Sequence, residues 1–138
     1  MPRPTLALQK AVVAALLGDA AVTAAVGDRL YDAPPREPVF PYVTIGETRV
    51  SDWSTGTEEG AEHRLSLQVW SRERGKRQCY EIMDAIEATL HDAALTLDGH
   101  ALVNLRFEFA EVGRERDGIT WRAAMRFRAV TERVNGEW

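Results

Sequence analysis

Three stretches of the chain alternate between hydrophobic and polar positions, which is the two-residue period of a β-strand with one buried face. In residues 63–70 the apolar positions are Leu65, Leu67 and Val69. In the last third of the chain they are Val103, Leu105, Phe107 and Phe109, and then Trp121, Ala123, Met125 and Phe127. A further strand is predicted from residue 41 to about residue 50, with Val43 and Ile45 on one face and Thr44 and Thr48 on the other.

Hydrophobic residues recur at helical spacing in residues 76–91, where the stripe is Cys79, Ile82, Met83, Ile86 and Leu90. Near the N-terminus, Thr5 is expected to cap a helix that runs to about Leu17, with Pro4 outside it and Gly18 at its end. Asp19 is expected to cap a second, shorter helix over residues 20–26. Residues 29–32 are expected to be briefly extended, and residues 33–38 form a loop because three prolines fix φ and remove donors.

The pairing of the last two strands depends on the loop that contains Asp117 and Gly118. A two-residue loop would set the apolar face of one strand against the polar face of the other. A three-residue loop over residues 116–118, with Gly118 left-handed, brings like faces together. This loop predicts four opposed pairs: Phe107 with Phe127, Phe109 with Met125, Glu108 with Arg126, and Arg106 with Arg128.

These elements predict an α+β fold, with an antiparallel sheet, helices packed on one of its faces, N-terminal helices and a C-terminal β-hairpin. With 138 residues the chain is expected to form one domain over residues 1–138. Seventeen Lys and Arg against 21 Asp and Glu give a formal net charge of −4, which does not favour a DNA-gripping surface. Cys79 is the single cysteine, and we expect neither a signal peptide nor a membrane-spanning segment.

No arrangement of residues typical of catalysis is present in the sequence. His63, His91 and His100 lack metal-ligand or nucleophile spacing, and are expected to be surface or structural residues. Glu58 and Glu59 are neighbours and would diverge, so a solvated loop tip is favoured over a catalytic pair. We therefore predict no catalytic residue, no cofactor and no metal site.

Two clusters remain as candidates for binding. Arg72, Arg74, Lys76 and Arg77 are interpreted as a charged turn before a helix, with a contact to DNA or to an acidic partner as the alternative. Among Trp53, Trp70 and Trp138, two lie outside the inferred core pattern, and exposed aromatic residues often mark interfaces. For Trp70, packing under a neighbouring loop is the equal alternative.

Taken in order, several segments resemble one protein family: "LQKAVVAALLGD", "AAVTAAVGDRLYDAPP", "FPYVTIG", "HRLSLQVWSRERGKRQCYEIMDAIEATL" and "RDGITWRAAMRFRAVTE". The chain resembles the tail-completion, or tail terminator, proteins of long-tailed phages and related gene transfer agents, over residues 6–132. The resemblance implies a non-enzymatic α+β subunit. Such subunits form a hexameric ring on the end of the tail tube, stop its growth and offer the surface that docks to the head or neck.

The resemblance also implies the partners and the location. These are further copies of the chain, the tail tube protein, head or neck connector proteins, and DNA that passes through the ring without sequence-specific binding. The particle is assembled in the bacterial cytoplasm, and this subunit sits at its head–tail junction. The residues that we expect to contact neighbouring subunits or the tube are Trp53, Thr55, Glu58, Glu59, Trp70, Arg106, Glu108, Arg126 and Arg128.

Two alternatives stay open at this point. One is a head-completion or neck connector adaptor, because such proteins share small α+β folds. The other is a small ligand-binding protein or enzyme with a pocket between sheet and helices, which a deep polar pocket with His63 or His91 and convergent carboxylates would favour.

Overall fold

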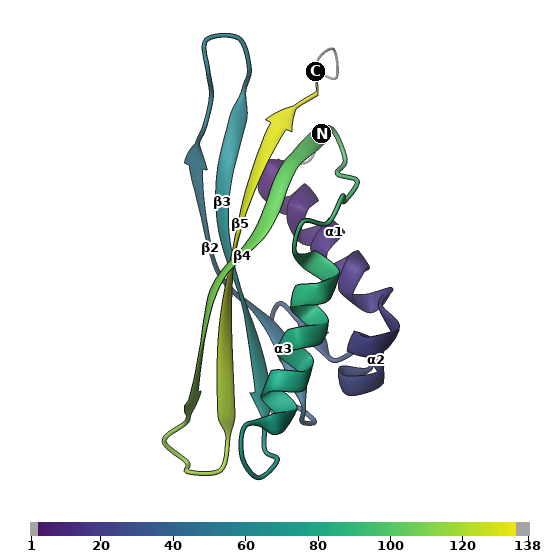
Figure 1. The fold of residues 1–138 in the computed structure, drawn as a ribbon, viewed down its shortest axis with the longest axis vertical. Helices are drawn as coiled ribbons and strands as arrows, with labels where there is room; N and C mark the ends of the chain where they lie inside the picture. Colours follow the sequence, from purple (N-terminus) through teal and green to yellow (C-terminus); the bar gives the residue numbers. More distant parts are fainter. Residues whose placement is uncertain (1–2, 135–138) are drawn as a thin grey trace.

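A computed structural model describes residues 3–134. Its elements in chain order are α1 (Pro4–Leu17), α2 (Ala20–Val26), β1 (Leu30–Tyr31), β2 (Tyr42–Asp52), β3 (Gly60–Ser71), α3 (Arg77–Leu90), β4 (His100–Arg114) and β5 (Trp121–Arg133). The strands form one twisted sheet in the order β1-β2-β3-β5-β4, and the three helices cover one of its faces (Figure 1). The α+β class, the N-terminal helices and the C-terminal hairpin are as predicted.

The sheet is mixed rather than purely antiparallel. Strands β2, β3, β5 and β4 pair antiparallel, but β1 pairs parallel with β2, with Leu30 opposite Val43. The proline-containing loop between β1 and β2 carries the chain back so that β2 runs in the same direction as β1. Arg29 ties the two ends of this loop together, because its Nε donates a hydrogen bond to the carbonyl of Pro41 at 2.9 Å.

The core lies between the sheet and the helices, where most of the predicted periodic residues meet. The prediction that Val103 lies on the buried face of β4 is wrong, because a register shift between Leu102 and Asn104 leaves it 52% exposed. The strand residues Leu67, Val69 and Phe127 are fully buried, as are Cys79, Ile82, Ile86 and Leu90 of the α3 stripe, whereas Met83 is partly buried. From α1, the buried residues are Ala7, Leu8, Val12 and Leu16. Hydrophobic burial of this kind is the main term that stabilises a small domain.

Both N-terminal helices have boundaries set by local backbone chemistry. Helix α1 starts at Pro4 with Arg3 as its N-cap, so the prediction that Thr5 caps it and that Pro4 lies outside is wrong. Proline fits the first helical turn because the N–H that it lacks has no partner there. The predicted cap of α2 is confirmed, since the Asp19 carboxylate accepts a hydrogen bond from the Val22 N–H at 3.0 Å.

The β4–β5 hairpin follows the predicted register only in part. Phe107 lies opposite Phe127 and Arg106 opposite Arg128, as predicted, but Phe109 lies opposite Arg126. The predicted pairs of Phe109 with Met125 and of Glu108 with Arg126 are therefore wrong.

The difference arises at the loop. The Glu115 N–H donates to the Thr120 carbonyl at 2.7 Å, so four residues form the loop instead of three, although Gly118 is left-handed as predicted, with φ 75°. A bulge between Phe107 and Phe109 then restores the pairing of like faces further along the strands. One consequence is that Phe109 leaves the core face and is 48% exposed.

A second irregularity lies in β2, between Ile45 and Thr48. Ile45 is opposite Leu67 and Thr48 is opposite Leu65, so both lie on the helix-covered face. The prediction that Thr48 faces away from Ile45 is wrong, because an extra residue in β2 shifts the alternation there.

Among the described residues, no single helix is long and apolar enough to span a bilayer; only the α1 and α2 pair reaches that composition, and it is bent by 82°.

Candidate interaction surface on the open sheet face

One face of the sheet carries no helix, and we call it the open face (Figure 1). The strand positions that alternate with the core point to this side, including Arg64 and Trp70 of β3 and Arg122, Arg126 and Arg128 of β5. A solvated sheet face is ordinary in antiparallel sheets and is usually polar. On this face, however, arginines from neighbouring strands lie directly opposite one another.

Four arginines lie in register across the open face. Arg49 of β2 is opposite Arg64 of β3, Arg64 is opposite Arg128 of β5, and Arg128 is opposite Arg106 of β4. We call these four residues the arginine row. With strands about 4.8 Å apart, the row is about 14 Å long. Like charges placed directly opposite one another destabilise a sheet, so the row needs compensation.

Carboxylates within the chain compensate only part of this charge. Glu62 lies between two members of the row, with Oε1 3.0 Å from Arg64 Nη1 and Oε2 2.7 Å from Arg128 Nη2. The hydrogen bond from Arg128 is the main reason that the pKa of Glu62 is lowered. Glu108 lies 3.3 Å from Arg64, and at the sheet edge Asp92 lies 3.7 Å from Arg106.

Two arginines of the open face have no carboxylate partner among residues 3–134. Arg49, at one end of the row, is exposed and forms no ion pair with any of these residues. Arg126 lies beside the row on β5, and its Nε is buried without a hydrogen-bond acceptor in the described chain. The open face therefore has positive charge that no carboxylate of residues 3–134 neutralises.

The arginines of β5 also contact aromatic rings from three other segments. The guanidinium of Arg122 lies 5.9 Å from the Trp70 ring centre, that of Arg126 lies 5.6 Å from Phe109, and that of Arg128 lies 5.1 Å from Trp53. Such contacts are favourable by about 0.5–1 kcal/mol at exposed sites. Arginine and aromatic residues are also the types that protein interfaces favour.

The β2–β3 hairpin extends past the helix layer at one end of the molecule (Figure 1). Its tip is hydrogen-bonded rather than open, because Trp53 N–H donates to the Gly60 carbonyl at 3.0 Å and Thr55 N–H to the Glu58 carbonyl at 2.9 Å. Trp53 is 52% exposed. A hollow of about 210 Å³ brings together Trp53, Thr55, Glu58 and Arg128 with Val103.

The predicted contact residues do not all lie together. Arg106, Glu108, Arg126 and Arg128 share the open face with the Trp53 hollow. Glu59 instead forms an ion pair with Arg133, at 2.9 Å. Trp70 lies at the far end of the face and is half-buried, stacked on Tyr42 with ring centres 5.8 Å apart. Trp138 lies outside the described residues.

Several residues of the surface were missed by the sequence prediction: Arg49, Glu62, Arg64, Arg122 and Phe109. All but Glu62 lie within predicted strands, but their neighbours depend on strand order and on two bulges. Arg72 is also separated from the rest of the predicted basic turn. Its guanidinium lies 4.2 Å from the Phe40 ring centre, and its Nε donates a hydrogen bond to the Thr120 hydroxyl at 3.0 Å.

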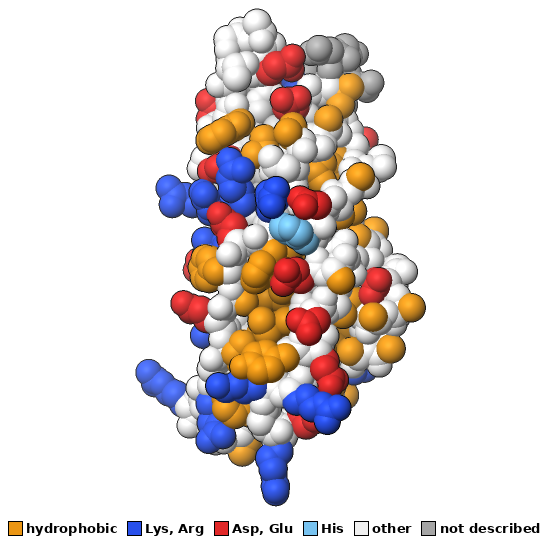
Figure 2. Space-filling view, in the orientation of Figure 1, with side chains coloured by type: hydrophobic (Ala, Val, Ile, Leu, Met, Phe, Trp, Pro, Cys, Tyr) orange, Lys and Arg blue, Asp and Glu red, His pale blue; other side chains and the backbone are white. Residues whose placement is uncertain are grey.

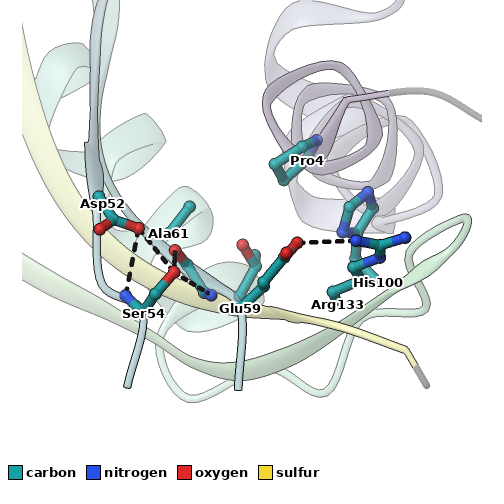
Figure 3. A pocket seen from close by; sticks show the side chains of 9 residues that line it. Pro4, Asp52, Ser54, Glu59, Ala61, His100 and Arg133 are labelled. Carbon is teal, nitrogen blue, oxygen red and sulfur yellow. Dashed lines mark hydrogen bonds and ion pairs between the residues drawn. The ribbon is translucent and has the colours of Figure 1, made fainter. Parts of the chain in front are cut away.

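A polar hollow of about 390 Å³ lies on the other side of the hairpin and bears on the ligand-binding alternative (Figure 3). Its lining includes Asp52, Glu59 and His100, but neither His63 nor His91. The two carboxylates are engaged separately, since Asp52 accepts a hydrogen bond from the Ser54 hydroxyl at 2.6 Å and Glu59 binds Arg133. Within residues 3–134, no cluster of three or more His, Cys, Asp or Glu could hold a metal ion.

His63 is fully buried rather than part of a solvent-accessible site. Its Nε2 lies 2.9 Å from the Thr131 hydroxyl, and its Nδ1 has no hydrogen-bond partner in the described chain. Burial, and then the charge of nearby His100, lower the pKa of His63 to about 4. The imidazole is therefore neutral at pH 7 and has a structural place in the core.

The fold is a small α+β domain in which one sheet face lacks a helix layer and carries paired and unpaired arginines with aromatic residues. Comparison with known proteins identifies the family. The family model described as "Tail completion protein gp17" matches residues 10–132, and the chain belongs to this family.

Two solved structures are similar to the chain. One is a chain of the virion of a native gene transfer agent particle: it is 34% identical, with 93% of this chain and 96% of that chain covered and a TM-score of 0.87. The other is the gp17 protein of bacteriophage SPP1, 22% identical, with 97% of this chain and 93% of that chain covered and a TM-score of 0.63, which shows the fold. No curated protein matches the chain.

Proposed function

We propose that this protein is a tail terminator of a phage or gene transfer agent particle, which caps the end of the tail tube as a ring. The ring ends tail elongation and offers the surface to which the head or neck docks, so the protein acts at the head–tail junction. The observation that carries this proposal is the 34% identity and TM-score of 0.87 to a chain of a gene transfer agent virion, over nearly the whole length of both chains.

The distribution of surface features supports a ring subunit. A closed ring needs heterologous contacts, in which two different surfaces of each subunit are complementary. The open face has arginines that no carboxylate of residues 3–134 neutralises, together with exposed aromatic rings, whereas the helix layer covers the opposite side of the sheet. The β2–β3 hairpin, with exposed Trp53 beside its tip, is a suitable extension toward the tail tube or a neighbouring subunit.

The charge of the chain suits a ring through which DNA passes. Its formal net charge is −4, and three carboxylates lie within salt-bridge distance of the arginine row. DNA affinity that depends on phosphate neutralisation rises with the number of uncompensated cations. We propose that DNA traverses the ring without sequence-specific binding; tight, salt-sensitive DNA binding by the isolated ring would contradict this.

Electron microscopy of particles that carry a tagged copy tests the proposed location. A small tag inserted at residues 35–36 lies in the exposed loop between β1 and β2. We expect the label at the head–tail junction, and we expect tails of abnormal length when the gene is removed. A label at the distal tip of the tail, or no label in the particle, would overturn the proposal, and a label inside the neck without tail-length defects would favour a connector adaptor.

The role of the β2–β3 hairpin can be tested with one substitution and a matched control. Trp53→Ala removes an exposed aromatic side chain beside the tip of this hairpin, and Ile119→Ala removes an exposed apolar side chain from the opposite β4–β5 hairpin. We expect fewer head-joined tails with Trp53→Ala and a normal number with Ile119→Ala. Equal yields of joined particles would remove the hairpin from the proposed contact.

A further inference from the structure

The exposed side of α3 carries acidic residues without partners. Asp84 and Glu87 have no cationic side chain within salt-bridge distance in the described part of the chain. With Ala88 and His91 they line a shallow hollow of about 410 Å³, which we call the acidic face. Figure 2 shows a column of acidic side chains over α3. This charge, like that of Arg49 and Arg126, is not neutralised by any side chain of residues 3–134.

An apolar strip runs beside the acidic face, between α3 and β4. Its members pack against the core but are only partly buried: Met83, Phe107, Ala110, Val112 and Trp121. In Figure 2 this strip is the hydrophobic area next to the acidic column. Asp84 and Glu87 lie on the α3 side of the strip, whereas at its other end the cations of Lys76 and Arg114 lie 5.7 and 4.6 Å from the Trp121 ring centre. An apolar strip with acidic residues along one side favours a partner that brings apolar groups and positive charge to that side.

We propose that the acidic face and apolar strip of one subunit receive the open face of a second copy, so that this contact joins neighbouring subunits of the ring. The inference rests on the proposed ring. The unpaired arginines Arg49 and Arg126 lie against Asp84 and Glu87 of the neighbour. The aromatic rings of the open face, Phe109 among them, cover the neighbour's apolar strip.

Three observations favour a second copy over DNA. Both surfaces belong to the same chain and lie on different layers of it, as a heterologous contact requires. Their sizes are comparable, since the arginine row is about 14 Å long and the acidic face rises about 10 Å along α3 from Asp84 to His91. The open face also contains Glu62 and Glu108, which would repel phosphates, together with aromatic rings that match an apolar strip.

Charge reversal tests the pairing directly. The first variant changes the acidic face and carries Asp84→Arg and Glu87→Arg. The second variant changes the open face and carries Arg49→Glu and Arg126→Glu. None of these four side chains has an ion-pair partner among residues 3–134, so no salt bridge between described residues is lost. We expect each variant to enter purified particles at least about tenfold less than the wild type, as for close interfacial charge pairs. The four substitutions combined should restore most of the incorporation. The control is Arg36→Glu with Glu37→Arg, in an exposed loop, which should incorporate normally.

A cross-linking experiment tests the geometry without reversing charge. Arg49→Cys and Asp84→Cys in one chain place a thiol on each surface, while the native Cys79 is buried. A short bismaleimide should then link subunits in particles into a ladder that ends at the ring. Arg36→Cys with Asp84→Cys should give no ladder.

The outcomes separate this inference from the proposed function. Normal incorporation of both reversed variants, or no ladder, would overturn the interface even if the tag lies at the head–tail junction. Loss in both variants without restoration in the combined one would also overturn it, and would assign the arginines to another partner such as the tube or DNA. Absence of the wild-type protein from particles would overturn the proposed function itself.

Discussion

The buried His63 predicts a loss of stability in mild acid that is specific to one side chain. In the unfolded chain this imidazole binds a proton below its ordinary pKa of 6.5, but in the folded protein its pKa is lowered to about 4. Between these pH values the unfolded state holds more protons, so the free energy of unfolding falls as the pH falls. Above pH 6.5 the group makes no pH-dependent contribution.

The size of the effect follows from the difference between the two pKa values. At about 1.4 kcal/mol for each pKa unit, a pKa lowered from 6.5 to about 4 corresponds to about 3 kcal/mol. Marginally stable domains have about 5–15 kcal/mol in total, so this loss is measurable. The cause is desolvation in the core, where only the Thr131 hydroxyl lies within hydrogen-bond distance of the ring among the described residues.

Urea unfolding followed by tryptophan fluorescence, at several pH values from 4 to 8, measures this dependence. His63→Leu removes the titrating group from the same buried position, so the difference between wild type and variant should change by about 3 kcal/mol across the range and be flat above pH 6.5. Thr131→Val keeps the imidazole and should keep the slope. If the free energy of unfolding of wild type and of His63→Leu depended on pH in the same way, the reasoning would be refuted, because all other titrating groups are common to both.

Further predictions concern the core, the caps and the turns, and each is measured by urea unfolding. Phe127→Ala opens a cavity at a fully buried position and should cost about 3–5 kcal/mol, whereas exposed Phe109→Ala should cost far less; equal costs would contradict the observed bulge. Asp19→Ala removes the carboxylate that caps α2 and should cost about 1 kcal/mol. Gly118→Ala should cost about 1 kcal/mol through its positive φ alone, because no atom lies within 4 Å of the added Cβ. Gly56→Ala, in similarly open space but without a positive φ, should be nearly neutral.

The secondary elements could be predicted because their signals are local. The α3 stripe and the alternation in β3 fix which side chains are buried whatever else the chain does, and Asp19 caps α2 through its own next turn. The start of α1 was predicted two residues late and with the wrong cap, because Pro4 and Thr5 both suit a helix start and local chemistry alone does not rank them.

The candidate surface was harder to predict, because it depends on which strands are neighbours. Arg106 and Arg128 were predicted to be opposite, since a hairpin joins their strands. Arg64 joins the row only because β3 lies next to β5, although α3 and β4 separate them in the chain. The spacing of residues along the sequence does not show that β3 and β5 are neighbours in the sheet.

The sequence by itself determined the α+β class, the buried faces of α3 and β3, and the resemblance to tail completion proteins, because periodicity and capping act over a few residues. The tertiary structure decided the register. A loop one residue longer than predicted and a bulge between Phe107 and Phe109 turned Phe109 outward to Arg126, and the sheet order aligned Arg49, Arg64, Arg128 and Arg106. Registers follow from the sum of all pairings in a sheet, so one inserted residue changes which charges meet.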